Sequence, residues 1–143
     1  MSKLPTAARL FLGLAFTVFG LNGFLQFLPM PPMSGEPAAF MGALAATGYM
    51  FPLIKGTEVV AGLLLLGNRL VPLALTLLAP ILVNIVAFHV LLARGGVGLP
   101  LALLSAELFL AYAYRHAFAP MLAVHVAPTA TEPARSVSVA PAE

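Results

Sequence analysis

The stretch LVPLALTLLAPILVNIVAFHVLL, residues 70–92, decides the fold. It contains no Asp, Glu, Lys or Arg, and it exceeds the roughly 20 apolar residues that a helix needs to cross the hydrocarbon core of a bilayer. Three further windows, 8–28, 49–67 and 99–119, have the same apolar character. Tight connections between neighbouring windows make consecutive helices antiparallel. The sequence therefore predicts an all-α membrane protein, an antiparallel bundle of four transmembrane helices.

The composition supports this prediction and excludes other classes of protein. Of the 143 residues, 61% are hydrophobic and 8% are charged, whereas soluble domains carry about 25% charged residues. The seven Lys and Arg residues are scattered singly, which argues against nucleic acid as a partner. The chain has no Cys, so disulfides, iron-sulfur clusters and thiolate metal sites are excluded.

The connection after the first span predicts a short surface helix. The prolines of PMPPMSGEP, residues 29–37, end the first helix, and the apolar segment 37–47 is too short to cross a bilayer. We expect it to lie at the extracytoplasmic membrane surface. The first span lacks a small-x-small cleavage site, so we interpret it as a retained anchor. The membrane domain is then 1–123, and the Pro-, Ala-, Ser- and Thr-rich segment 124–143 is predicted to be a disordered cytoplasmic tail.

The distribution of basic residues predicts the orientation. Cytoplasmic ends of membrane helices are enriched in Lys and Arg. On one side of the predicted membrane lie five basic residues, and on the other only one: Lys3, Arg9, Arg69, Arg115 and Arg135 against Arg94. We expect a multi-pass protein of the cell membrane with both termini in the cytoplasm.

Seven polar residues interrupt the apolar spans. They are Asn22, Gln26, Lys55, Glu58, Asn84, His89 and Glu107. A charge at mid-bilayer costs at least about 2.5 to 3.5 kcal/mol, so each charged group needs a partner or a hydrated cavity. At a rise of about 1.5 Å per residue, one polar residue from every span falls in a single layer in the outer half of the bundle. We therefore expect one connected, inward-facing site, covered by the surface helix.

The candidate roles follow from the residue types. Glu58, Glu107 and His89 are candidates for proton handling, and the remaining four, Asn22, Gln26, Lys55 and Asn84, for ligand binding. Lys55 and Glu58 are three residues apart and share a helix face, so they can also form a purely structural ion pair. The amides can equally be hydrogen-bonding contacts between helices, each contributing about 0.6 kcal/mol. Glu107 has no basic neighbour on its own face and must be protonated or paired with Lys55 or His89.

Several kinds of cofactor site are absent from the sequence. No Glu-x-x-His pair for a di-iron site, no P-loop and no nucleophile elbow is present. His89 lies at a different depth from His116 and His125, which excludes a haem held by two histidines within the bundle. The sequence thus predicts no metal site and no intrinsic cofactor. It assigns no catalytic residue and leaves open whether the protein is an enzyme.

Several segments in combination resemble a known family. They are RLFLG (9–13), FGLNGF (19–24), PMPP (29–32), GALAATGY (42–49), EVVAGLLLL (58–66), VPLAL (71–75), APILVNI (79–85) and FH (88–89). Together these segments, spread over residues 7–122, are similar to the DoxX family of small bacterial membrane proteins. The resemblance implies a four-helix bundle in the bacterial inner membrane, related to the small subunits of thiosulfate:quinone oxidoreductase and to membrane partners of redox and thiol-defence enzymes. It brings no catalytic assignment with it.

Two classes of function remain. The first is a membrane subunit of a quinone-linked redox system, in which the polar layer binds a quinone head group and a redox protein is the partner. The alternative is a non-enzymatic protein, either a carrier for a small solute or proton or a scaffold that recruits another protein. Both readings place the chain in a lipid bilayer, and homo-oligomers are compatible with either.

Overall fold

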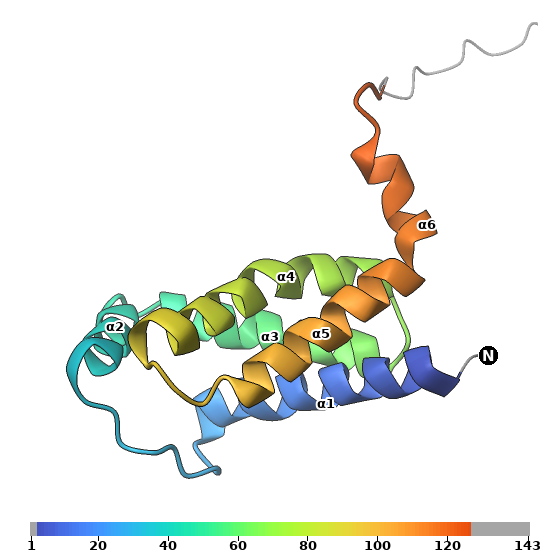
Figure 1. Ribbon diagram of the computed structural model, residues 1–143. Coiled ribbons are helices and arrows are strands. Elements are labelled where there is room, and N and C mark those ends of the chain that lie inside the picture. The colour runs from blue at the N-terminus through green and yellow to red at the C-terminus, as the bar shows by residue number, and fades with distance from the viewer. Residues whose placement is uncertain (1–2, 127–143) are drawn as a thin grey trace, which may run out of the picture.

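The computed structural model describes residues 3–126, and this part of the chain is helical, without a β-strand (Figure 1). Its elements are α1 (Lys3–Leu25), α2 (Gly35–Ala46), α3 (Met50–Leu66), α4 (Val71–Ala87), the π-helical η1 (Phe88–Leu92), α5 (Gly98–Ala113), α6 (Arg115–Phe118) and the 3-10 helix η2 (Ala119–Leu122). The predicted all-α class is confirmed. Of the predicted tail 124–143, residues 127–143 lie outside the described part.

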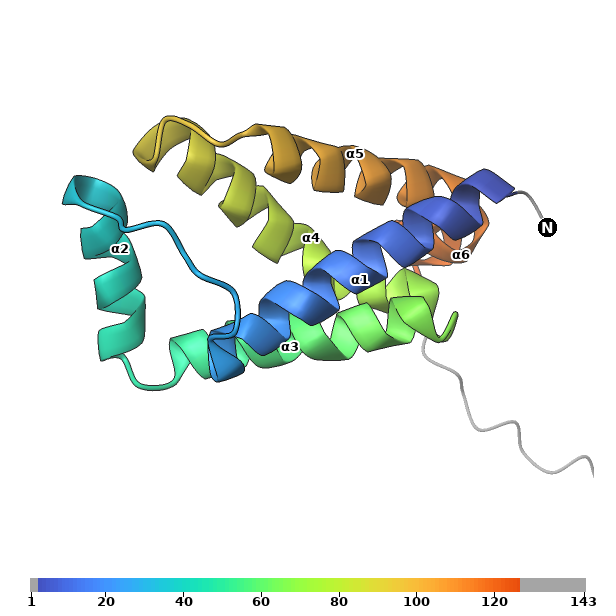
Figure 2. The same cartoon turned by 90° about the horizontal axis from the view of Figure 1, so that it is seen from below.

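The four longer helices surround one apolar core. α1 contacts α3 along most of its length, α3 contacts α4, α4 contacts α5, and α5 contacts α1 (Figure 2). The helices therefore form a ring in which α3 and α5 lie diagonally. The core between them is built of fully buried side chains, including Leu12, Leu65, Leu78, Leu82 and Leu110.

The close contact of α1 with α3 depends on small residues. A Cβ added to Gly62 would lie 2.5 Å from Oγ1 of Thr17 and 2.9 Å from the carbonyl oxygen of Gly13. A Cβ added to Gly20 would lie 2.8 Å from a methyl carbon of Val59. Small residues let helix backbones approach closely, which is the usual basis of helix association in lipid.

Arg9 joins these two helices at the end opposite α2. Its guanidinium is buried and donates hydrogen bonds to the carbonyl oxygens of Leu65 and Leu66, the second at 3.1 Å. These carbonyls belong to the last turn of α3, where the helix dipole favours a cation. Arg9 therefore has a structural role. The sequence had indicated only that its charge helps to orient the chain in the membrane.

The short helix predicted over 37–47 is present as α2. The axis of α2 turns by 91° from that of α3, so that α2 crosses one end of the ring (Figure 2). Its Phe40 ring contacts the ring of Phe88 in η1, with centroids 5.7 Å apart. α2 thus links the start of α3 with the end of α4.

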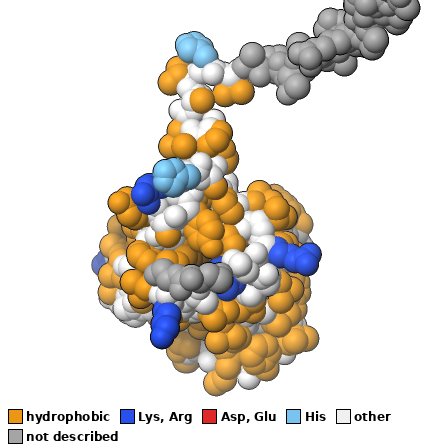
Figure 3. Space-filling model, turned by 90° about the vertical axis from the view of Figure 1, so that its right-hand side faces the viewer, with side chains coloured by type: hydrophobic (Ala, Val, Ile, Leu, Met, Phe, Trp, Pro, Cys, Tyr) orange, Lys and Arg blue, Asp and Glu red, His pale blue; other side chains and the backbone are white. Residues whose placement is uncertain are grey.

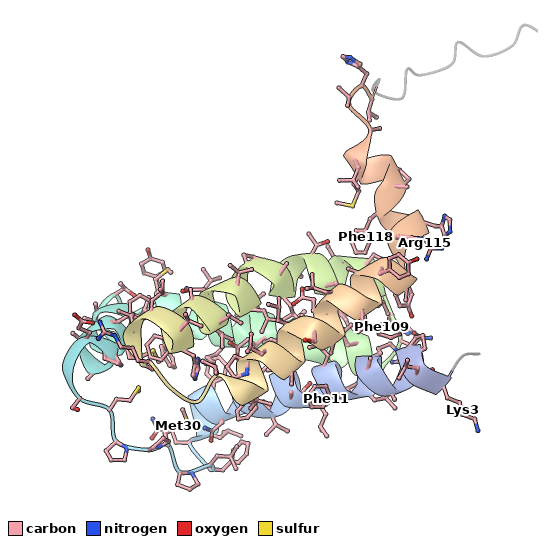
Figure 4. All side chains as sticks on the ribbon, viewed as in Figure 1. Lys3, Phe11, Met30, Phe109, Arg115 and Phe118 are labelled. Atoms are coloured by element: carbon pink, nitrogen blue, oxygen red, sulfur yellow. The ribbon has the colours of Figure 1, made fainter. Side chains whose placement is uncertain are left out.

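Helix length and surface composition together indicate association with a membrane. Within residues 3–126, α1 and the continuous helix Val71–Leu92 are long and apolar enough to cross a bilayer, and the bent pair α2–α3 can count as a third span. Large apolar side chains also stand exposed on the outer faces, such as Phe11 on α1 (Figure 4). Soluble monomers rarely expose contiguous apolar surface of this extent.

The last predicted span ends earlier than expected. The window 99–119 predicted one helix, but α5 stops at Ala113 and Tyr114 leaves the helical conformation at φ −98° and ψ 15°. The following α6 then runs away from the axis of α5 (Figure 1). Hydropathy alone does not place this break, because the apolar residues that follow Arg115 and His116 extend the predicted window to 119.

Candidate functional site

A hollow of about 440 Å³ opens beside α2, where α1 ends and α3 begins. Asn22, Gln26 and Lys55 supply its polar groups. Its apolar lining includes Phe19 on α1, Met30 in the following loop, Met41 on α2 and Phe51 on α3. Three of the seven predicted site residues therefore line one hollow.

The chain reverses its direction at this hollow. α1 ends at Leu25, three residues before the predicted end of the span, and Gln26 has φ 49°, in the left-handed region that often terminates a helix. The Oδ1 atom of Asn22 accepts a hydrogen bond of 2.6 Å from the backbone N–H of Leu28. Asn22 thus holds the turn after α1 in place with its carbonyl oxygen. Gln26 is exposed, beyond the end of the helix on which it was expected.

Lys55 and Glu58 form the ion pair that their spacing predicts. The Nζ atom of Lys55 donates a hydrogen bond to Oε2 of Glu58 at 2.8 Å. The side chain of Glu58 is 2% exposed, and that of Lys55 is 20% exposed. Nζ also lies 5.9 Å from the ring centroid of Phe51. The pair therefore places an anion in the core and leaves its cation in contact with the hollow.

Glu107 lies at a second, separate hollow of about 410 Å³ between α4, α5 and the α6–η2 segment. It is buried, and its Oε2 atom has no hydrogen-bond partner among the described residues. The hollow includes Leu75 and Thr76 from the first turns of α4, so it lies toward the end of the ring opposite α2. Of the two alternatives for Glu107, a proton or a pairing with Lys55 or His89, the pairing is not present.

The prediction of one connected site in the outer half of the bundle is therefore wrong. No residue lines both hollows, and no hydrogen bond or ion pair in residues 3–126 links Glu58 to Glu107. The physical reason is that the rotation of each helix about its axis, and not depth alone, decides what surrounds a side chain. Glu107 lines the second hollow, whereas Glu58 lines neither hollow and pairs with Lys55.

Asn84 and His89 line neither hollow. Asn84 was expected to face the core, but it is exposed on the outer side of α4, as are Leu77 and Leu73, about two and three turns before it. His89 is half-buried in η1, where its Nδ1 atom lies 2.8 Å from the carbonyl oxygen of Ile85. The structure therefore does not bring these two residues to the other predicted site residues.

Sequence reasoning missed the apolar members of the first hollow and Gly23. A Cβ added to Gly23 would lie 2.5 Å from Cγ of Lys55, so only glycine gives the lysine stem its path across α1. The sequence does not show that a glycine in an apolar window lies against a particular side chain, because that side chain belongs to another helix.

Among the described residues, no group of three or more His, Cys, Asp or Glu side chains is placed to hold a metal ion. No protein-family model, curated protein or solved structure matches this chain. Any assignment of function must therefore come from the two hollows and the residues that line them.

Proposed function

We propose that this chain is a DoxX-like, multi-pass protein of the bacterial cell membrane and serves as the membrane subunit of a quinone-linked redox system. The first hollow would hold the quinone head group. The observation that carries the proposal is the placement of Lys55, which pairs with buried Glu58 and also lines the hollow.

The proposal places four helices across the membrane. α3 has 17 residues and α5 has 16, which correspond to about 26 and 24 Å of helix, somewhat short of a hydrocarbon core of about 30 Å. Short spans are accommodated by local thinning and by polar and aromatic residues at the interface. Tyr112 in the last turn of α5 and Arg115 at the start of α6 are residues of this kind.

The same proposal puts both termini in the cytoplasm. Lys3, Arg69 and Arg115 are exposed. Lys3 and Arg115 lie at the end of the bundle that carries α6 (Figure 4), and Arg69 lies in the turn between α3 and α4. Figure 3 shows the end with the N-terminus, where basic side chains stand out from a largely apolar surface and no acidic side chain is visible. α2 and the first hollow would then lie at the outer surface.

The lining of the first hollow suits a quinone head group, which is a flat apolar ring with two carbonyl acceptors. The Lys55 ammonium has three N–H donors, of which Glu58 uses one. The side-chain amides of Gln26 and Asn22 offer further N–H donors. In Asn22 only the carbonyl oxygen is used, because it accepts the hydrogen bond from the N–H of Leu28. Phe19 and Phe51 supply aromatic surface for the ring. The volume lies within the range of about 300 to 1,000 Å³ typical of small-molecule sites.

The roles within this site divide between the chain and its ligand. A bound quinone supplies the redox chemistry, and a partner protein exchanges electrons with it. Lys55 would donate a hydrogen bond from Nζ to the head group, and the ion pair with Glu58 holds the lysine side chain in position. The apolar surface around the hollow keeps the head group at the edge of the lipid, where an isoprenoid tail can extend along the helices.

The test is to measure quinone bound to the purified full-length protein. We expect protein prepared in lipid nanodiscs to retain quinone when small molecules are extracted and identified by mass spectrometry. A photoreactive azidoquinone should label peptides of α1 and α3. The Lys55→Met variant should lose both signals, while Lys3→Met, an exposed change of the same type, should keep them.

Two results would count against the proposal. Labelling of Lys55→Met equal to that of the unchanged protein would remove the assigned role of the ammonium. Absence of quinone together with protein-dependent movement of a solute or of protons across liposomes would favour the carrier instead.

A further inference from the structure

The second hollow has a composition that the proposed quinone site does not share. Its lining is apolar apart from Thr76 and Glu107, and no basic side chain contributes to it. Glu107 comes from α5, and the rest of the wall from α4, α5 and the α6–η2 segment, on which Phe118 lies next to the end of α5 (Figure 4). Glu107 as a whole residue is 5% exposed, and its Oε2 atom has no hydrogen-bond partner among the described residues.

An unpartnered carboxyl oxygen in apolar surroundings is costly, because nothing replaces the water it has lost. Three basic side chains of the described part already have partners of their own. Lys55 is bound to Glu58, Arg9 to carbonyl oxygens of α3, and the guanidinium of Arg115 to the carbonyl oxygen of Tyr112 at 3.1 Å. Either a proton or a group from outside the chain must therefore satisfy Glu107, and an outside group must carry a hydrogen-bond donor.

We propose that this hollow is a binding site for a lipophilic amine, an alkylammonium head attached to an apolar body. One N–H of the ammonium would donate to Oε2 of Glu107, and its positive charge would balance the carboxylate where charge interactions are little screened. The Thr76 hydroxyl donates to the carbonyl oxygen of Pro72 at 2.9 Å, so its oxygen lone pairs are free to accept a second N–H.

The remaining lining fits the apolar body of such a molecule. Leu75, Leu104 and Phe118 are at least partly buried against the core, whereas Val83 and Leu108 are exposed on the outer surface. The hollow therefore opens to the side of the protein that contacts lipid. A lipophilic amine can reach it from the bilayer, in which its apolar body is already dissolved.

Charge discriminates against related amphiphiles. A fatty carboxylate would place a second anion beside Glu107, and a fatty alcohol would donate a hydrogen bond without balancing the charge. The amine is the only one of these three head groups that does both. No residue of this hollow belongs to the quinone site, so the two proposals stand or fall separately.

The experiment uses the full-length protein in nanodiscs of uncharged, zwitterionic lipid, with a diazirine-bearing dodecylamine as photolabel. We expect labelled peptides from α4, α5 and η2, and competition by unlabelled dodecylamine. Glu107→Gln keeps the shape of the side chain and removes its charge. It should lower labelling about tenfold or more, since hydrogen bonds to charged groups are the stronger ones. Glu36→Gln, the same change at an exposed position of α2, should leave labelling unchanged.

A second variant tests the hollow without altering its charge. Ala79→Phe places a large ring in the lining of the hollow and should block labelling while Glu107 remains. Full labelling of Glu107→Gln or of Ala79→Phe would overturn the site. Competition by dodecanol or dodecanoate as effective as that by dodecylamine would overturn the assignment to amines.

Discussion

The stem of Lys55 crosses α1 directly at Gly23, where an added Cβ would lie 2.5 Å from Lys55 Cγ and 2.7 Å from Cδ. This path brings Nζ to 2.8 Å from Oε2 of Glu58. Lys55 also lines the hollow next to α2. One glycine on α1 therefore positions a cation that both neutralises a buried acid and faces the proposed ligand.

The first prediction concerns Gly23. Gly23→Ala should displace the stem of Lys55, weaken its ion pair with Glu58 and lower quinone labelling severalfold. Gly56→Ala is the matched control, because an added Cβ there meets nothing within 4 Å. Alanine is the better helix former by about 1 kcal/mol, so the control should be neutral or slightly stabilising. Both variants can be compared by thermal unfolding in detergent and by azidoquinone labelling. Equal behaviour of the two variants would show that the contact is unimportant.

The second prediction concerns the buried ion pair. Removing one partner of a buried pair leaves an uncompensated charge and costs about 3 to 5 kcal/mol. Part-exposed Lys55 places this pair at the lower end of that range, so Lys55→Leu should lower the free energy of unfolding by about 3 kcal/mol. The double variant Lys55→Leu, Glu58→Leu removes both charges and should recover much of the loss. A double variant less stable than Lys55→Leu would contradict this account.

The third prediction concerns Arg9. Arg9→Ala should destabilise the protein by about 2 kcal/mol, because two carbonyl oxygens of α3 lose a charged donor. Lysine keeps the charge but lacks the planar array of donors, so Arg9→Lys should fall between alanine and the unchanged protein. Arg69→Ala, at an exposed position in the turn after α3, should have little effect. The measurement is the thermal midpoint of purified protein in one detergent. If Arg69→Ala were as destabilising as Arg9→Ala, the buried contacts would not be the cause.

The fourth prediction concerns orientation. The chain has no Cys, so single cysteines at Ser34, Asn68 and Gly95 can be labelled without background. All three positions are exposed, in loops after α1, α3 and η1. An impermeant maleimide added to intact cells should label Ser34→Cys and Gly95→Cys but not Asn68→Cys. The reverse pattern would overturn the proposed cytoplasmic termini.

Local features of the site were predictable, and features that depend on helix rotation were not. The Lys55–Glu58 pair follows from a three-residue spacing, which places both side chains on one face of any helix. The outward position of Asn84 and the separate hollow of Glu107 depend on how α4 and α5 are turned about their axes. In a soluble helix an apolar stripe marks the inner face. In this protein the outer faces of the helices are also apolar. The apolar residues therefore do not show which face of a helix points into the core.

By itself the sequence determined the all-α class, the approximate positions of the main helices apart from the early end of α5 at Ala113, the short helix α2 and the ion pair of α3. These follow from apolar run length, proline and glycine breaks, and spacing within one helix. Only the tertiary structure decided the ring order α1–α3–α4–α5 and the separation of Glu58 from Glu107 into different surroundings. The reason is that helix order and rotation are set by contacts between distant segments, such as Gly62 against Thr17 and Gly23 against Lys55, and no local pattern encodes which glycine meets which side chain.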